Sequence, residues 1–247
     1  MATREMKPAA VVLQAIFAVS MAAVVGAGAW TQPKGQGYYE ITTQMLRGDD
    51  YRDREGFATV IPTLSEYTIS LYAEYGVLED LTLVAYAPLF KRITLNEQIG
   101  KQSDFVYFGG DDVHGIADAE VGLRYRLFDS PSGILSTAVT LGLPVGDDQH
   151  PNGLLTGDGE FNQQFSVLAG RSLYPLPAYV GIEAAYNLRH SGYADDISLR
   201  AEAGMSWRRW SLSLRAHALE SRDNGDEAVS GGAGGLYGND RRYLIYG

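Results

Sequence analysis

The feature that most constrains this chain is an alternation of apolar and polar residues with a period of two, repeated in many segments after residue 29. Successive residues of a strand point to opposite faces, so each such segment has one apolar and one polar face. The alternation is clearest in 67–75, 119–127, 178–188, 197–207 and 210–218. Weaker alternation marks 38–46, 81–89, 135–145, 165–173 and a last segment that starts near Arg241. The pattern predicts an all-β fold of about ten antiparallel strands, each near the ~9–11 residues that cross a bilayer when tilted.

The first 29 residues are typical of a signal peptide. Arg4 and Lys7 precede an apolar run, and Ala27-Gly28-Ala29 forms a small-x-small cleavage site. We therefore expect residues 1–29 to be removed and residues 30–247 to form one domain. After the leader, no apolar run reaches the ~18–20 residues of a transmembrane helix, so a mature chain that enters a membrane needs a closed barrel.

The connections between the alternating segments differ in length in a regular way. Long connections are expected at 47–63, 91–116, 146–161 and 220–240, and one of intermediate length at 189–196. Short ones are expected at 76–80, 128–134, 173–177 and 207–210, with Tyr75, Trp207 and Trp210 close to them. Long external loops, short periplasmic turns and interfacial aromatic residues are features of outer-membrane barrels. A soluble sandwich also alternates but has no reason to gather its long loops at one end. We therefore expect an up-and-down barrel in the outer membrane of a Gram-negative bacterium, with its first strand running outward.

The composition argues against several other classes of protein. With 30 acidic and 20 basic residues, the formal net charge is −10, which opposes nucleic-acid binding. The chain has no cysteine, so disulfides, thiolate metal sites and cysteine nucleophiles are excluded. Acidic clusters near Asp49, Asp111, Asp147 and Asp223 lack the spacing of a calcium-binding loop. We expect them to form a solvated rim, and we expect no cofactor and no metal.

Several short stretches over most of residues 29–207 resemble a known family. They begin with the run from Ala29 to Tyr39 (AWTQPKGQGYY), and the most specific are the run from Asp118 to Leu127 (DAEVGLRYRL) and Leu143 to Asp147 (LPVGD). The others are 72–76, 81–84, 156–160 and 169–172. They are similar to bacterial outer-membrane proteins described as MetA-pathway of phenol degradation or XagA-like proteins. The resemblance implies a barrel of roughly twelve strands that passes small, often hydrophobic or aromatic, compounds, and it brings no catalytic residues.

The end of the chain departs from that pattern. Outer-membrane barrels usually finish in a strand with a terminal aromatic residue, whereas this chain stops at Tyr246-Gly247. Either the last strands are missing and the barrel is incomplete, or the barrel is smaller. The distinction matters, because an open sheet edge is untenable in lipid.

Charged side chains occupy the polar faces of the expected strands. The candidate lumen-facing residues are Glu66, Glu74, Glu120, Arg124, Arg126, Glu183, Arg200, Glu202, Arg215 and His217. Opposed charges can guide a polar solute through a pore. They can also pair with one another and close the lumen of a small barrel. The residues themselves are compatible with both arrangements.

Two functional hypotheses follow. The first is a narrow channel or transporter, whose partners are the lipid bilayer and a small-molecule solute. The second is a structural or surface-interaction (adhesin-like) barrel with a closed lumen. We do not expect an enzyme. His217 and Ser213 share a strand face, but residues i and i+4 of a strand lie ~13 Å apart, too far for a hydrogen bond.

Overall fold

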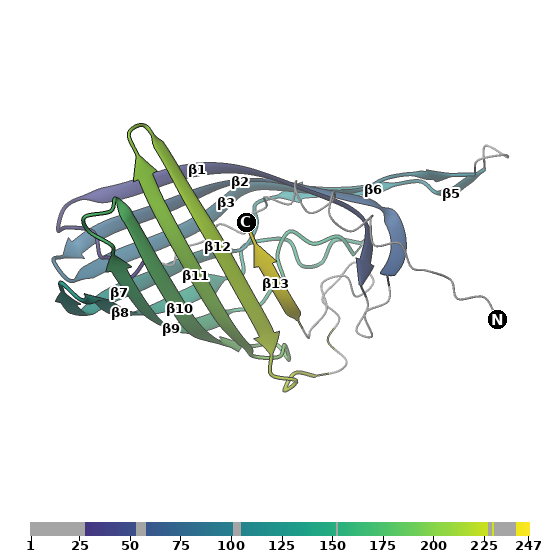
Figure 1. The fold of residues 1–247 in the computed structure, drawn as a ribbon. Coiled ribbons are helices and arrows are strands. Elements are labelled where there is room, and N and C mark those ends of the chain that lie inside the picture. Colours follow the sequence, from purple (N-terminus) through teal and green to yellow (C-terminus); the bar gives the residue numbers. More distant parts are fainter. Residues whose placement is uncertain (1–27, 53–57, 101–104, 152, 227–228, 230–240) are drawn as a thin grey trace, which may run out of the picture.

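The computed structural model describes residues 28–52, 58–100, 105–151, 153–226, 229 and 241–247 (Figure 1). In this part of the chain, every regular element is a strand, which confirms the predicted all-β class. Ten strands form the main path of one sheet: β1 (Gly37–Arg52), β2 (Ala58–Leu78), β3 (Leu81–Leu95), β7 (Ala119–Ser130), β8 (Gly133–Leu143), β9 (Asn162–Ser172), β10 (Ala178–Arg189), β11 (Asp196–Trp207), β12 (Trp210–Ser221) and β13 (Arg242–Tyr246). No helix in the described residues is both long enough and apolar enough to cross a membrane.

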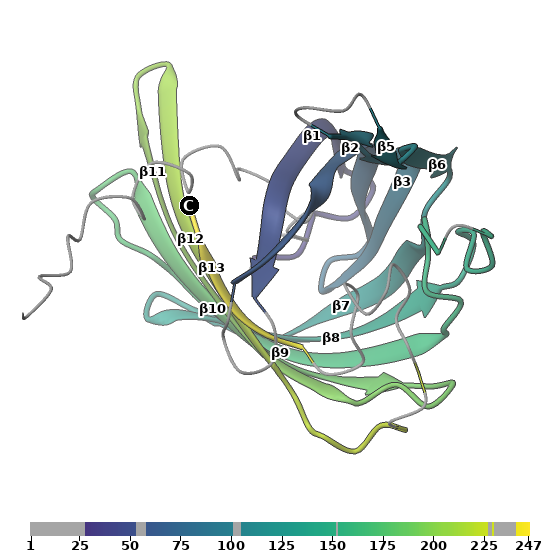
Figure 2. The same ribbon diagram turned by 90° about the vertical axis from the view of Figure 1, so that its right-hand side faces the viewer.

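The strands pair in a simple meander. Neighbours along the path are antiparallel throughout, and β1 and β13 form its two ends. Seen along its axis, the sheet curls into a half-barrel, with β1 across from β12 and β13 (Figure 2). The short β13 pairs with residues 216–220 of β12. Among the described residues, no pairing joins β1 to β13, so the sheet has two edges.

Three shorter strands lie at one end of the sheet, and only one of them pairs with it. β6 (Asp111–Gly115) pairs with the last residues of β3, beyond the point where β7 pairs with it. β4 (Gln98–Ile99) and β5 (Val106–Phe108) form a small separate hairpin that projects away from the half-barrel (Figure 1).

The loop predictions for 47–63 and 91–116 were therefore largely wrong. β1 and β2 pair as far as Arg52 and Ala58, and β3 runs to Leu95. The end of this ladder contains Asp49 and Asp50 and lacks the alternation that marks a strand with one buried face. Backbone hydrogen bonds pair such strands whether or not one face is apolar, and hydrophobic periodicity cannot detect them. The long connection predicted at 146–161 is confirmed, because β8 ends at Leu143 and β9 begins at Asn162.

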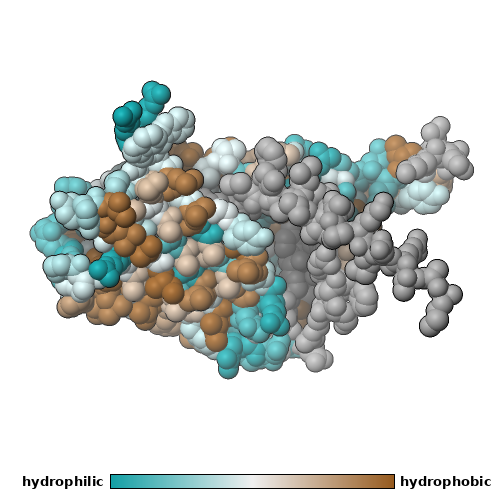
Figure 3. Space-filling model, viewed as in Figure 1, coloured by the Kyte–Doolittle hydropathy of each residue, from teal (hydrophilic) through white to brown (hydrophobic). Residues whose placement is uncertain are grey.

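The two faces of the sheet differ as the alternation predicts. The convex face exposes apolar side chains from every strand of the path: Ile41, Ile69, Leu83, Leu123, Val139, Val167, Ile182, Leu199, Leu212 and Leu244. On the face seen in Figure 3, patches of apolar residues (brown) lie over β9–β12, with hydrophilic residues toward the ends. The concave face carries buried polar residues, among them Thr82, Ser136, Ser166 and Ser198.

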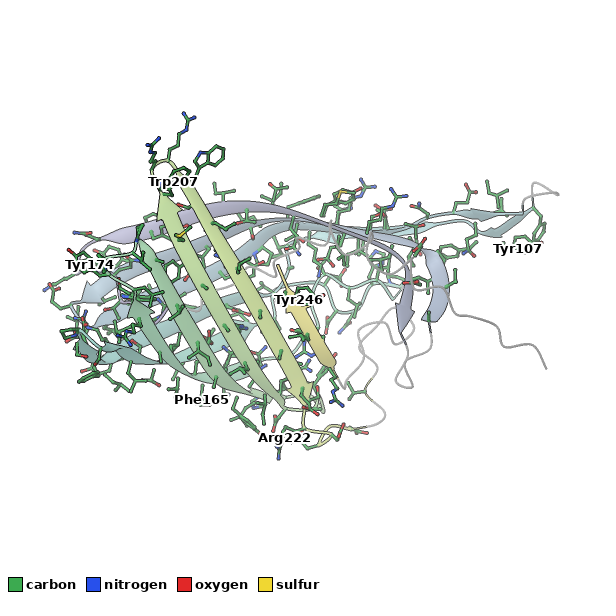
Figure 4. The ribbon with its side chains drawn as sticks, in the orientation of Figure 1. Tyr107, Phe165, Tyr174, Trp207, Arg222 and Tyr246 are labelled. Carbon is green, nitrogen blue, oxygen red and sulfur yellow. The ribbon has the colours of Figure 1, made fainter. Side chains whose placement is uncertain are left out.

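Long and short connections lie at opposite ends of the curled sheet. Tyr174 and Trp207 mark the end with the short turns, and Arg222 lies at the other end (Figure 4). Tyr107, on β5, lies far beyond Arg222 in the same direction (Figure 4). The expected asymmetry of connections is thus present in the fold.

Candidate functional site

Three ion pairs lie on the concave face, one across β3 from β2 to β7 and two between directly neighbouring strands. Arg124 lies 3.0 Å from Glu74, and both side chains are almost fully buried. Arg200 lies 3.2 Å from Glu183, directly opposite it in the β10–β11 register. Arg215 lies 3.1 Å from Glu202, directly opposite it in the β11–β12 register. The inward-facing glutamates and arginines are therefore paired with one another. Paired charges cost less free energy to bury than single charges.

The other predicted lumen residues lie at different depths. Glu66 pairs with Lys91 at 3.5 Å. Glu120 has no described ion-pair partner and lines a small void of about 20 Å³ together with Glu183 and Arg200. Arg126 departs from the prediction, because a β-bulge follows it and its guanidinium pairs with Asp80 and Asp129 at the short-turn rim.

His217 faces inward, and its ring meets Tyr243 of β13 edge to face at 5.2 Å. Its Nε2 is buried and has no hydrogen-bond partner among the described residues. Among the described residues, no hydrogen bond joins this ring to a hydroxyl group.

The segment before β1, residues 28–36, lies against this concave face. Ala29 is fully buried, and its carbonyl accepts a hydrogen bond from Ser136 Oγ at 2.5 Å. The Trp30 carbonyl accepts one from Arg124 at 2.9 Å. The Trp30 ring packs edge to face on Tyr179, with 5.7 Å between ring centroids.

The same segment continues along β2 and β3 to the short-turn end. Gln32 donates through its backbone N–H to Thr82 Oγ1 and through its side chain to Glu74, both at 2.7 Å. Lys34 forms an isolated parallel bridge with Gly76, whose backbone also bonds to Gly35 and Gln36. The sequence predictions missed this position, because the segment does not alternate and its partners are far away in the chain.

A cavity of about 830 Å³ opens between this segment, strands β1, β2, β7 and β10–β12, and the turn between β9 and β10. Three carboxylates line it (Glu40, Glu74 and Glu202), with two guanidiniums (Arg124 and Arg215). Aromatic rings complete the lining: Trp30, Tyr38, Tyr72, Tyr174 and Tyr179. Its volume is in the range of small-molecule sites, and its lining combines apolar surface with convergent polar groups, as such sites do.

A second polar cluster ties the long connections together at the opposite end. Arg189 is buried and contacts Glu160 at 2.6 Å, Asp158 at 3.4 Å and Asp196 at 3.9 Å. Its guanidinium also lies over the ring of Tyr193, 4.4 Å from the centroid. Arg241, which directly precedes β13, also pairs with Asp196. This arrangement packs residues 153–161 onto the ends of β10 and β11, and the sequence predictions treated these acidic residues only as a rim.

We expect the outer cluster to be sensitive to pH through Glu160. Burial raises the pKa of Glu160 from its ordinary value of 4.5 to about 7, although Arg189 opposes the shift and Asp158 adds to it. The charged groups that face Glu160 are Arg189, Asp158 and Arg241. The folded chain binds this proton more tightly than the unfolded chain. Its contribution to stability is therefore full below pH 4.5 and is lost as the pH rises through about 7.

Hydrogen exchange of residues 153–161 measures this effect. After correction for intrinsic rates, protection should fall by roughly tenfold or more between pH 5.5 and pH 8. Glu160→Gln should keep protection equal at both pH values. The exposed Glu220, 4.0 Å from Arg242, provides a control, because Glu220→Gln should leave the pH dependence as it is. Wild-type protection that does not change with pH would contradict the prediction.

The described residues contain no group of three or more His, Cys, Asp or Glu side chains arranged to hold a metal ion. Neither a scan against protein-family models nor a search of curated proteins gave a match to this chain.

Proposed function

We propose that the protein is an outer-membrane β-barrel that serves as a narrow channel for small molecules. The observation that carries the proposal is the 830 Å³ cavity on the concave face, with charges of both signs and aromatic rings in its lining. Charges of opposite sign across a path orient a polar solute, and aromatic surface accommodates an apolar part. The cavity therefore favours a small solute with both polar and apolar groups, including the aromatic compounds that the family resemblance implies.

The convex face supports the membrane part of the proposal. Apolar side chains are exposed on every strand of the path, an arrangement that suits lipid and is costly in water. Trp207 and Trp210 flank the turn between β11 and β12, where interfacial aromatic residues are expected. Insertion also requires the edges of β1 and β13 to be paired in the bilayer, because unsatisfied backbone groups cannot face lipid.

Planar-bilayer recordings and liposome swelling test the channel directly. The purified full chain should conduct ions in small steps and admit a small aromatic solute more readily than a large sugar. A protein that shows a heat-modifiable, folded band on gels and yet is silent in both assays would refute the channel.

Charge changes in the cavity should alter ion selectivity. Arg215→Gln removes a cation from the cavity and leaves Glu202 without its ion-pair partner, so the preference for cations over anions should rise by a factor of about two or more. Reversal potentials in a salt gradient give this ratio. Arg208→Gln, in the turn outside the cavity, is the matched control and should not change it. If the wild type, Arg215→Gln and Arg208→Gln show the same ion selectivity, ions do not pass through this cavity.

A structural or surface-interaction barrel is the second candidate function. Two observations favour it: the paired charges that fill part of the concave face, and the hairpin of β4 and β5 that projects beyond the barrel. If this is the function, cells that display the barrel should bind a surface, and a short turn in place of residues 96–110 should abolish that binding. Binding that survives this replacement would count against the hairpin as the contact.

A further inference from the structure

We infer that the mature chain begins at Gly28 and that residues 28–36 are seated inside the barrel as a lumenal plug. The inference concerns a processing site, the peptide bond between Ala27 and Gly28, and the role of the segment that this cut leaves at the N-terminus. The plugging role rests on the proposed channel. The position of the cut and the binding of residues 28–36 to the concave face (below, the seat) do not depend on it.

The first argument is the burial of Ala29. This residue is 0% exposed and packs with Ile134 and Leu168 of the wall. Its carbonyl accepts the hydrogen bond of Ser136, whose side chain is also 0% exposed. A cut after Ala29 would remove the apolar contact and leave a buried hydroxyl without its acceptor, each an unfavourable change.

The second argument is the shape of the wall, which has glycines where the segment approaches most closely. A Cβ at Gly170 would lie 2.7 Å from the Trp30 ring. A Cβ at Gly76 would collide with the backbone oxygens of Gln32 and Pro33. Any larger residue at either position would force the segment to move. The two glycines therefore allow residues 30–36 to approach the sheet closely at two separate places.

The third argument is the sequence upstream of Gly28. Val25-Gly26-Ala27 places a short aliphatic residue three positions before the cut and alanine immediately before it, a pattern close to A-x-A. Hydrolysis adds one water across the Ala27–Gly28 bond. The new carboxylate stays on the leader, and the new α-ammonium stays on Gly28.

The charge balance of the cavity fits this new terminus. Gly28 lines the cavity, where three carboxylates face two guanidiniums. Arg124 and Arg215 are paired with Glu74 and Glu202. Glu40 accepts hydrogen bonds from Tyr38 at 2.6 Å and Thr42 at 3.0 Å, and the cation near it is Arg215, which is already paired with Glu202. An α-ammonium on Gly28 would add a third positive charge to this surface and so match the three carboxylates.

The cut is tested by the mass of the exported protein. The full chain with its leader is produced in a Gram-negative host and purified from the outer membrane. Intact mass and N-terminal sequencing should give Gly28 as the first residue. A chain that begins at Trp30, or one that keeps residues 1–27, overturns the inference whether or not the barrel conducts.

The seat and its plugging role are tested on the same protein by hydrogen exchange and conductance. The backbone N–H groups of Gln32 and Gly35, which bond to Thr82 and Gly76, should exchange slowly. Trp30→Ala and Gly76→Val should speed their exchange about tenfold or more and raise conductance several-fold. Gly109→Ala, where nothing lies within 4 Å of the added Cβ, should match the wild type in both. Trp30→Ala removes side-chain atoms and adds none to the sheet. It therefore still tests the inference if Gly76→Val fails to fold.

The outcomes separate the plug from the channel. Fast exchange at Gln32 and Gly35 in the wild type overturns the seat. If the variants exchange these amides faster but conduct as the wild type does, at a non-zero level, the segment does not plug the channel. Slow exchange in a wild type that is silent, together with silent variants, upholds the seat and instead refutes the proposed channel.

Discussion

Replacing Arg124 with methionine should lower the free energy of unfolding by about 3–5 kcal/mol. The substitution leaves Glu74 as a carboxylate in the interior without its cation, with side-chain exposures of only 3% for Arg124 and 9% for Glu74. It also removes the hydrogen bond to the Trp30 carbonyl, which holds the N-terminal segment. Urea unfolding of the protein refolded in lipid vesicles, followed by tryptophan fluorescence, measures the loss.

Two further variants make the Arg124 experiment specific. Arg126→Met removes a guanidinium from the same strand, but this one pairs at the exposed rim and should cost less than about 1 kcal/mol. The double change Arg124→Met and Glu74→Leu should recover much of the loss, because it removes both charges together. If Arg124→Met unfolds at the wild-type urea concentration, the buried pair does not stabilise this part of the sheet.

The second large effect is expected at the opposite end of the sheet. Arg189→Met should release the long connections, because Glu160, Asp158 and Asp196 lose the cation that they share. Breaking such a buried network costs about 3–5 kcal/mol, which corresponds to at least a hundredfold faster hydrogen exchange in residues 153–161 and 190–195. Strands β7–β9 near the short turns should keep their protection.

Arg92→Met is the matched control for Arg189. Arg92 also pairs with an aspartate, Asp112 at 3.3 Å, but both side chains are about half exposed. Its replacement should change exchange by less than about fivefold, because solvent already screens the pair. Equal effects of the two substitutions would show that burial does not determine the strength of these contacts.

The strand alternation was predictable because it is a local property. Residues 178–188 and 197–207 alternate so regularly that both their faces and, within a residue, their boundaries agree with β10 and β11. The loop asymmetry followed from the spacing of these segments. The outer parts of β1 and β2 were not predictable in this way, because both of their faces are polar or mixed and only backbone pairing makes them strands.

The sequence patterns could not predict which charged residues pair with one another across the strands. Glu183 and Glu202 were expected to face the lumen together with Arg200 and Arg215, but the patterns allowed either a pore lined by separate charges or a lumen closed by salt bridges. A strand that slipped by two residues would keep every side chain on its face and change every partner. The antiparallel registers of β10, β11 and β12 decide that Glu183 meets Arg200 and Glu202 meets Arg215.

The sequence by itself determined the alternating strands, and with them the all-β class, the apolar convex face and the separation of short turns from long connections. These properties depend on neighbours one to ten residues apart. Only the tertiary structure decided that residues 28–36 lie on the concave face, that Arg189 gathers three carboxylates, and that the curled sheet leaves β1 and β13 as edges. Those contacts join residues up to 107 positions apart, and they form only when the whole sheet has curled.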